Sequence, residues 1–210
     1  MVGVAVLCGV WAWALMPPAL KADLPAAVPP VPVGAEVITL GSGCFWKGGA
    51  VFQQIPGVLN VTAGYMGGDF PNPTYEQVGG GLTGHTEVSR IVYDPTKCDL
   101  ERILAVFWAT HDPTHGNARS ARSVIFCDDP KQREVAERSK KERAANLKAM
   151  ILTEVETAGE FYAAEKSHQD YYGVARNGFA SCPLPFSPEL KSLGIGVRAE
   201  KDGNTQLQKP

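Results

Sequence analysis

The motif Gly43-Cys44-Phe45-Trp46 places a nucleophilic side chain beside two aromatic rings. A β-branched, alternating run over residues 36–40 predicts a strand before the motif, and apolar residues at near-helical spacing predict a helix after it. A thiol at the N-terminal end of a helix lies at the positive end of the helix dipole, which favours the nucleophilic thiolate. Cys44 is therefore a candidate nucleophile, while a buried packing role is the alternative that composition alone allows.

Two further motifs, in long loops between predicted strands, carry polar groups that could assist a thiolate. The motif Asn-Pro-Thr-Tyr ends in Tyr75, and the motif Thr-Gly-His-Thr-Glu ends in Glu87 at the start of a predicted strand. Partial burial at a strand start would raise the pKa of Glu87, so that it could donate a proton near neutral pH. Taken singly, Glu87 is also compatible with an ordinary strand-edge glutamate, and Tyr75 with a packing residue.

These residues need a sheet and helices to position them. Periodicity predicts further strands over residues 58–63, 87–93, 122–127 and 151–155, and helices over residues 100–108, from 130 onward and over 159–172. Some strands follow one another without a helix between them, which favours an α+β fold over a doubly wound sheet. We expect a two-layer fold in which a mixed sheet is backed by helices, followed by an irregular C-terminal tail.

The chain has 210 residues and a formal net charge of −2, which argues against nucleic acid as a partner. Residues 1–22 form an apolar leader that predicts a signal or targeting segment, and residues 23–34 form a Pro/Ala-rich linker expected to lack packed structure. The catalytic domain is assigned to residues 35–182 and the irregular tail to 183–210. The leader predicts an exported or organellar protein; a cytoplasmic location is the alternative, because no basic residue precedes the apolar run.

The cysteines do not form a metal-binding pattern. They are Cys8, Cys44, Cys98, Cys127 and Cys182. No pair has C-x-x-C spacing, and the close histidines His111 and His115 are separated by Pro113, so we expect no metal site. A disulfide framework is possible by count, and the alternative is that one or two cysteines are chemical while the others are incidental.

The motifs together, in their order along the chain, resemble those of the peptide-methionine (S)-S-oxide reductase family, the A-type methionine sulfoxide reductases. Besides the three motifs above they are Gly64-Tyr65-Met66-Gly67-Gly68, Tyr93-Asp94-Pro95, Phe107-Trp108, His111-Asp112-Pro113-Thr114, Phe161-Tyr162, Glu165 and His168-Gln169. The resemblance runs from about Val37 to Cys182.

The resemblance implies a role for each candidate residue. Cys44 would attack the sulfoxide sulfur, and Phe45 with Trp46 would hold the methyl group of the substrate. Glu87 would protonate the sulfoxide oxygen, with help from Tyr75. The expected activity is thiol-dependent reduction of methionine-(S)-sulfoxide, free or in oxidised proteins and peptides, and thus protein repair.

The resemblance also implies how the thiol is regenerated. Attack leaves a sulfenic acid on Cys44, which Cys182 would condense to a disulfide. Thioredoxin, or dithiothreitol in vitro, would then act as the reductant, and no bound cofactor is expected. Cys98 and Cys127 match no family role, and inert packing is expected for both.

Two departures from the family pattern leave alternatives open. Gly49 stands where the family usually has glutamate, and the segment over residues 115–121 is several residues short, with Ala121 in place of a second active-site tyrosine. One alternative is therefore a catalytically impaired relative that binds oxidised methionine without efficient turnover. Another is a cysteine acyl-transfer enzyme that pairs Cys44 with His85 or His168, although neither Glu87 nor Tyr75 has a purpose in it.

Overall fold

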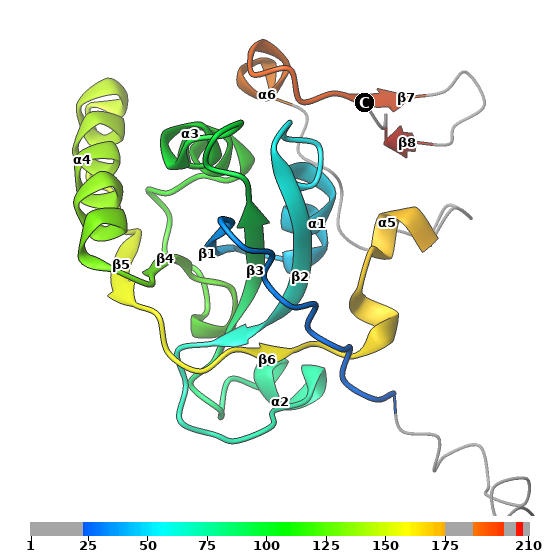
Figure 1. The fold of residues 1–210 in the computed structure, drawn as a ribbon. Helices are drawn as coiled ribbons and strands as arrows, with labels where there is room; N and C mark the ends of the chain where they lie inside the picture. Colours follow the sequence, from blue (N-terminus) through cyan, green and yellow to red (C-terminus); the bar gives the residue numbers. More distant parts are fainter. Residues whose placement is uncertain (1–22, 175–186, 200–204, 208–210) are drawn as a thin grey trace, which may run out of the picture.

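A mixed six-stranded sheet forms the centre of the domain. The computed structural model describes residues 23–174, 187–199 and 205–207 (Figure 1). The strands are β1 (Glu36–Ser42), β2 (Val58–Met66), β3 (Thr86–Tyr93), β4 (Ser123–Cys127), β5 (Glu154–Thr157) and β6 (Tyr162–Ala163). Their order in the sheet is β5-β4-β1-β3-β2-β6, and only the β4–β5 pair is parallel. The predicted α+β fold with a mixed sheet is confirmed.

Helices and short turns connect these strands. The helices are α1 (Phe45–Phe52), α2 (Tyr75–Gly79), α3 (Leu100–Thr110), α4 (Pro130–Leu147), α5 (Tyr171–Val174) and α6 (Pro188–Ser192), with 3-10 turns η2 (Arg119–Ala121) and η3 (Lys166–His168). Strands β7 (Val197–Ala199) and β8 (Thr205–Leu207) form a separate hairpin. Among the described residues, no helix has the length and apolar character needed to cross a membrane.

The main core lies between the sheet and helices α1, α3 and α4. Ile103, Leu104 and Phe107 of α3 are completely buried in it, as the helical spacing of these residues predicts. Asp99 caps α3, because its side chain accepts a hydrogen bond from the N–H of Arg102 at 2.8 Å. In Figure 1, α4 lies beside α3 and runs along the β4–β5 side of the sheet.

Three segments differ from the sequence expectations. Residues 159–172 are mostly not helical: β6 pairs with Gly64 and Tyr65 of β2, and only the turn η3 and the start of α5 follow. The tail predicted as irregular contains α6, β7 and β8. The predicted linker is packed at its start, because the N–H of Ala26 donates to Ala164 O at 3.0 Å and the N–H of Lys166 donates to Leu24 O at 3.1 Å.

Strand directions bring the predicted motifs to one end of the sheet. Strand β1 runs antiparallel to β3 and to β4, so its last residue, Ser42, pairs with Ser123 at the start of β4. The end of β2 likewise pairs with the start of β3, with Met66 opposite Thr86. Figure 1 shows β6 and α2 near this same end. The loops that carry the motifs therefore converge there.

Candidate active site

Cys44 lies at the junction between β1 and α1. Gly43 has a φ of +83°, which turns the chain out of the strand, and Cys44 is the N-cap residue of the helix. Its carbonyl accepts hydrogen bonds from the N–H groups of Lys47 and Gly48 at 3.2 and 3.4 Å. The residue is half-buried. The strand–turn–helix arrangement predicted for this motif is confirmed, and the thiol is at the positive end of the helix dipole.

Glu87 reaches the same helix terminus from β3. Its Oε2 accepts a hydrogen bond from the N–H of Phe45, the residue after Cys44, at 3.1 Å. Burial raises the pKa of Glu87 from 4.5 to about 7, and this effect exceeds the lowering caused by the Phe45 N–H. A carboxyl group with this pKa holds a proton that it can donate at neutral pH. The structure thus brings together Cys44 and Glu87, which are 43 residues apart in the sequence.

An aromatic group surrounds the first residues of α1. The ring of Tyr75 stacks on Phe45 and on Trp46, with centroid distances of 6.0 and 5.9 Å. His168 lies 4.3 Å from the Tyr75 ring, and its Nδ1 accepts a hydrogen bond from Trp46 Nε1 at 3.2 Å. Tyr171 stacks nearly parallel on Trp46 at 3.9 Å. These rings form an apolar wall beside the cysteine.

The sequence motifs indicate no site role for Tyr171, and they give His168 a chemical role only in the acyl-transfer alternative. A spacing of three residues between Glu165, His168 and Tyr171 was the available signal. In a helix over residues 159–172 this spacing would place the three side chains near one another on one face. They instead lie in and around the turn η3 and the first turn of α5.

Tyr75 is positioned by a buried carboxylate. Glu165 is 8% exposed; its Oε1 accepts from the N–H of Tyr75 at 2.9 Å, and its Oε2 accepts from the hydroxyl of Tyr65 at 2.8 Å. Burial and the adjacent Glu165 raise the pKa of Tyr65, so its hydroxyl remains a donor. Thr74 caps α2 in a capping box with Gln77. Side-chain oxygens thus accept from two consecutive backbone N–H groups, that of Thr74 and that of Tyr75.

Neither histidine of the acyl-transfer alternative is available as a base for Cys44. His85 is 1% exposed, and its Nδ1 accepts a hydrogen bond from the N–H of Gly68 at 3.2 Å. Its Nε2 therefore carries the proton and donates to Phe70 O at 2.8 Å. The Nδ1 of His168 accepts a hydrogen bond from Trp46 Nε1, so the lone pair of this nitrogen is not free to accept a proton from Cys44. The structure does not favour this alternative.

The remaining cysteines divide into two groups. Cys98 and Cys127 are buried, and burial raises the pKa of both thiols, that of Cys127 to about 11. Such thiols are poor nucleophiles, in agreement with the packing role expected for them. Cys182, the predicted second thiol, lies outside the described residues.

Comparison with known proteins identifies the family. Residues 36–194 match the family described as "Peptide methionine sulfoxide reductase". The chain belongs to this family. It is an oxidoreductase whose reaction is the thiol-dependent reduction of methionine sulfoxide.

Curated relatives agree along most of the chain. The peptide methionine sulfoxide reductase MsrA of Rhodospirillum centenum is 42% identical over 174 residues, which cover 75% of this chain and 80% of the relative. MsrA 1 of Rhodopirellula baltica is 46% identical over 145 residues, covering 66% of this chain and 76% of the relative. The impaired-relative alternative receives no support from these matches.

Solved structures of similar fold include Mxr1 of Saccharomyces cerevisiae in its reduced form. It is 28% identical, with a TM-score of 0.68, and the match covers 74% of this chain and 93% of Mxr1. Methionine sulfoxide reductase A of Corynebacterium diphtheriae is 35% identical, with a TM-score of 0.62, covering 72% of this chain and 79% of that protein. Mxr1 in complex with Trx2 shares the fold at 21% identity and a TM-score of 0.54, covering 79% of this chain and 98% of Mxr1.

Proposed function

We propose that Cys44 and Glu87 carry out the reduction and that the substrate is the (S)-epimer of methionine sulfoxide, free or in peptides and oxidised proteins. The observation that carries this proposal is the hydrogen bond of 3.1 Å from the N–H of Phe45 to Glu87. Phe45 directly follows Cys44, so this bond holds a proton donor next to the thiol. The aromatic wall formed by Phe45, Trp46 and Tyr75 suits the methyl group of the substrate.

The chemistry requires both a thiolate and an acid. The Cys44 thiolate attacks the sulfoxide sulfur while Glu87 donates its proton to the oxygen, which is a poor leaving group until it is protonated. The attack forms a bond between the two sulfur atoms; transfer of the hydroxyl group to Cys44 then breaks this bond and the S–O bond, releases methionine and leaves a sulfenic acid. The cysteine sulfur is oxidised by two electrons and the methionine sulfur is reduced by two. Tyr75 lies at the same wall, and its hydroxyl is the second group proposed to hold the oxygen.

Regeneration is assigned to Cys182 and thioredoxin. The thiol of Cys182 would condense with the sulfenic acid to give a Cys44–Cys182 disulfide and one water molecule. Thioredoxin, or dithiothreitol in vitro, would then reduce the disulfide. Support for thioredoxin comes from yeast Mxr1, which has been crystallised with Trx2. No bound cofactor enters this cycle.

The proposed residues can be tested by turnover of a peptide containing methionine-(S)-sulfoxide. With dithiothreitol as reductant, wild type is expected to reduce the (S)-epimer and not the (R)-epimer, and Cys44→Ser is expected to be inactive. Turnover by Cys44→Ser, or equal turnover of both epimers, would refute the assignment.

The resolving role needs a separate comparison. With thioredoxin as reductant, Cys182→Ala is expected to lose turnover, while Cys98→Ala, which removes a buried thiol, retains it. Without any external reductant, the Cys182→Ala variant should still reduce one equivalent of substrate per enzyme, because the Cys44 thiol alone supplies the two electrons. Undiminished thioredoxin-driven turnover by this variant would show that another group resolves the sulfenic acid.

We propose that the apolar leader over residues 1–22 directs the protein to an exported or organellar location. The support is its composition alone. Fractionation of cells that express the full-length chain and a variant lacking residues 2–22 tests the proposal: loss of the non-cytoplasmic pool in the shortened variant is expected, and an identical distribution of both would contradict it.

A further inference from the structure

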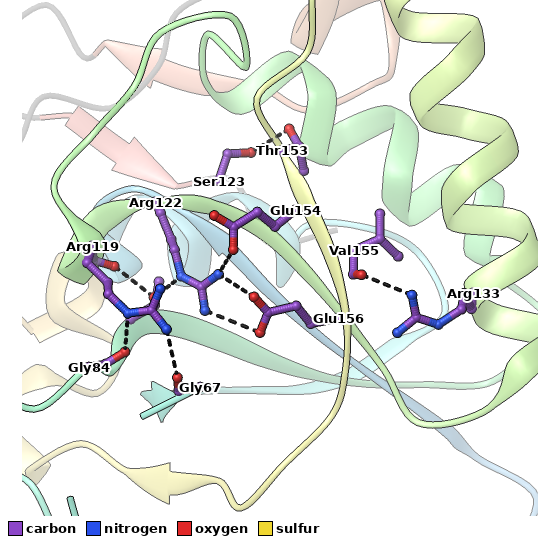
Figure 2. Close-up of polar contacts among 11 residues, drawn as sticks. Gly67, Gly84, Arg119, Arg122, Ser123, Arg133, Thr153, Glu154, Val155 and Glu156 are labelled. Carbon is purple, nitrogen blue, oxygen red and sulfur yellow. Dashed lines mark hydrogen bonds and ion pairs between the residues drawn. The ribbon is translucent and has the colours of Figure 1, made fainter. Parts of the chain in front are cut away.

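Arg119, in the short segment between α3 and β4, joins two site loops that are distant in sequence. Its Nε donates to Gly84 O at 3.0 Å and its Nη2 donates to Gly67 O at 3.3 Å (Figure 2). Gly67 directly follows the last residue of β2, and Gly84 lies two residues before the first residue of β3. One guanidinium group therefore joins the residue after the end of β2 to the loop just before the start of β3.

The backbone of Arg119 is fixed to the first residue of β3. Thr86 is completely buried, and its Oγ1 donates to Arg119 O at 2.8 Å while it accepts from Arg122 Nε at 2.8 Å. Arg122 in turn pairs with Glu154 and Glu156 of β5, as Figure 2 shows. These contacts link the edge strand β5 to the start of β3.

The start of β3 determines where Glu87 lies. Thr86 and Glu87 are consecutive in the strand, so their side chains point to opposite faces of the sheet. The backbone carbonyl of Arg119 and the side chain of Arg122 hold Thr86 on one face, while Glu87 reaches the N–H of Phe45 on the other. A shift of the strand start would move the Glu87 carboxyl away from α1.

We infer that Arg119 is a positioning residue for the sulfoxide reduction: by holding the ends of β2 and β3 together, it keeps the Glu87 carboxyl at the N-terminus of α1. This inference rests on the proposed roles of Cys44 and Glu87. Arg119 is suited to the task because its planar guanidinium donates in two fixed directions to two carbonyl groups, which an ammonium group cannot reproduce.

Three variants separate positioning from charge and from general stability. Arg119→Ala removes the two side-chain hydrogen bonds to Gly67 and Gly84, and Arg119→Lys keeps the positive charge but lacks the planar guanidinium. The matched control is Arg133→Ala, because Arg133 likewise donates to two acceptors, Val155 O at 3.0 Å and Thr157 Oγ1 at 3.1 Å, on the outer strand β5. Each variant is compared with wild type by kcat, KM, the pH dependence of kcat and thermal unfolding.

We expect kcat of Arg119→Ala to fall about tenfold with KM changed less than about twofold, because a misplaced proton donor slows the chemical step. The alkaline midpoint of its kcat profile should move to lower pH, since water that reaches Glu87 lowers the pKa of this residue. Tyr65, which lies opposite Glu87 in the β2–β3 pair, its neighbours Glu165 and Tyr75, and Cys44 are intact in each variant. Arg119→Lys should behave like Arg119→Ala, and Arg133→Ala should keep the wild-type kcat and pH profile.

The inference is overturned if Arg119→Ala retains the wild-type kcat and pH profile, if Arg133→Ala loses as much kcat, or if Arg119→Lys restores full activity. A second readout does not depend on turnover: the pKa of Glu87 in the resting protein, followed by NMR of ¹³C-labelled glutamate, should be lower in Arg119→Ala than in wild type. An inactive wild type would refute the proposed function instead.

Discussion

Replacing Glu87 by glutamine tests the electrostatics of the site through both stability and activity. The substitution keeps the side-chain size and an acceptor for the N–H of Phe45, and it removes the titration. Burial raises the pKa of Glu87 from 4.5 to about 7 in the folded protein, so folding favours the protonated carboxyl. The contribution of this group to stability is fully present below pH 4.5, declines as the pH rises, and is lost once the pH passes about 7.

The size of the effect follows from the pKa change. At about 1.4 kcal/mol for each pH unit, the window from 4.5 to about 7 corresponds to about 3 kcal/mol, or about 2 kcal/mol when solvent screening of a half-buried group is included. Urea unfolding of both proteins at several pH values from 4 to about 8 measures it. The free energy of unfolding of wild type should fall by this amount relative to Glu87→Gln as the pH rises through that window. A pH-independent difference between the two proteins would refute the reasoning.

Activity provides a second measurement on the same pair of proteins. Wild-type kcat should decline about tenfold for each pH unit above pH 7, because the protonated fraction of Glu87 declines in that way. Glu87→Gln should have kcat lower by a factor of about 10²–10⁴, the usual contribution of a general acid, without this alkaline decline. A glutamine variant that retains the alkaline decline would assign the titration to another group.

Further expectations concern the helix below the thiol and the support of the aromatic wall. Gly49→Ala should stabilise the protein by up to about 1 kcal/mol in urea unfolding, because a Cβ there has no atom within 4 Å and alanine favours the helix. Gly48→Ala should instead be destabilising, since its Cβ would lie 2.5 Å from Ser89 Oγ; equal effects of both substitutions would contradict this. Glu165→Leu should lower the free energy of unfolding by about 1–3 kcal/mol and raise KM, because the N–H of Tyr75 loses its acceptor, whereas Glu165→Gln should largely retain both.

Local patterns predicted the elements that carry the thiol and its partners. The alternation over residues 36–40, the glycine turn and the apolar spacing after Cys44 each reflect contacts within a few residues, and β1 and α1 follow them. The buried stripe of α3 and its Asp99 cap are local in the same sense. Strong local signals of this kind determine an element without knowledge of its neighbours.

The site could be predicted only in part because its remaining contacts are long-range. The hydrogen bond between Trp46 and His168 joins residues 122 positions apart, and Glu165 bonds Tyr65 across 100 positions. The local pattern predicts a helix over residues 159–172, and pairing of Tyr162 with β2 overrides that local preference. The role of Arg119 was also invisible in the sequence, because its partners are backbone carbonyls, which carry no residue signature.

Both borders of the sheet are poor templates for another chain. At one border, β5 has only four residues, and two of them, Glu154 and Glu156, are charged side chains that form ion pairs with Arg122. At the other border, β6 has only two residues, and Pro25, which lacks an N–H, forms a bridge with Glu165 beside it. Charge, short length and proline are the features by which outer strands resist pairing. Both borders of the sheet are thereby protected against edge-to-edge association with a strand of another chain.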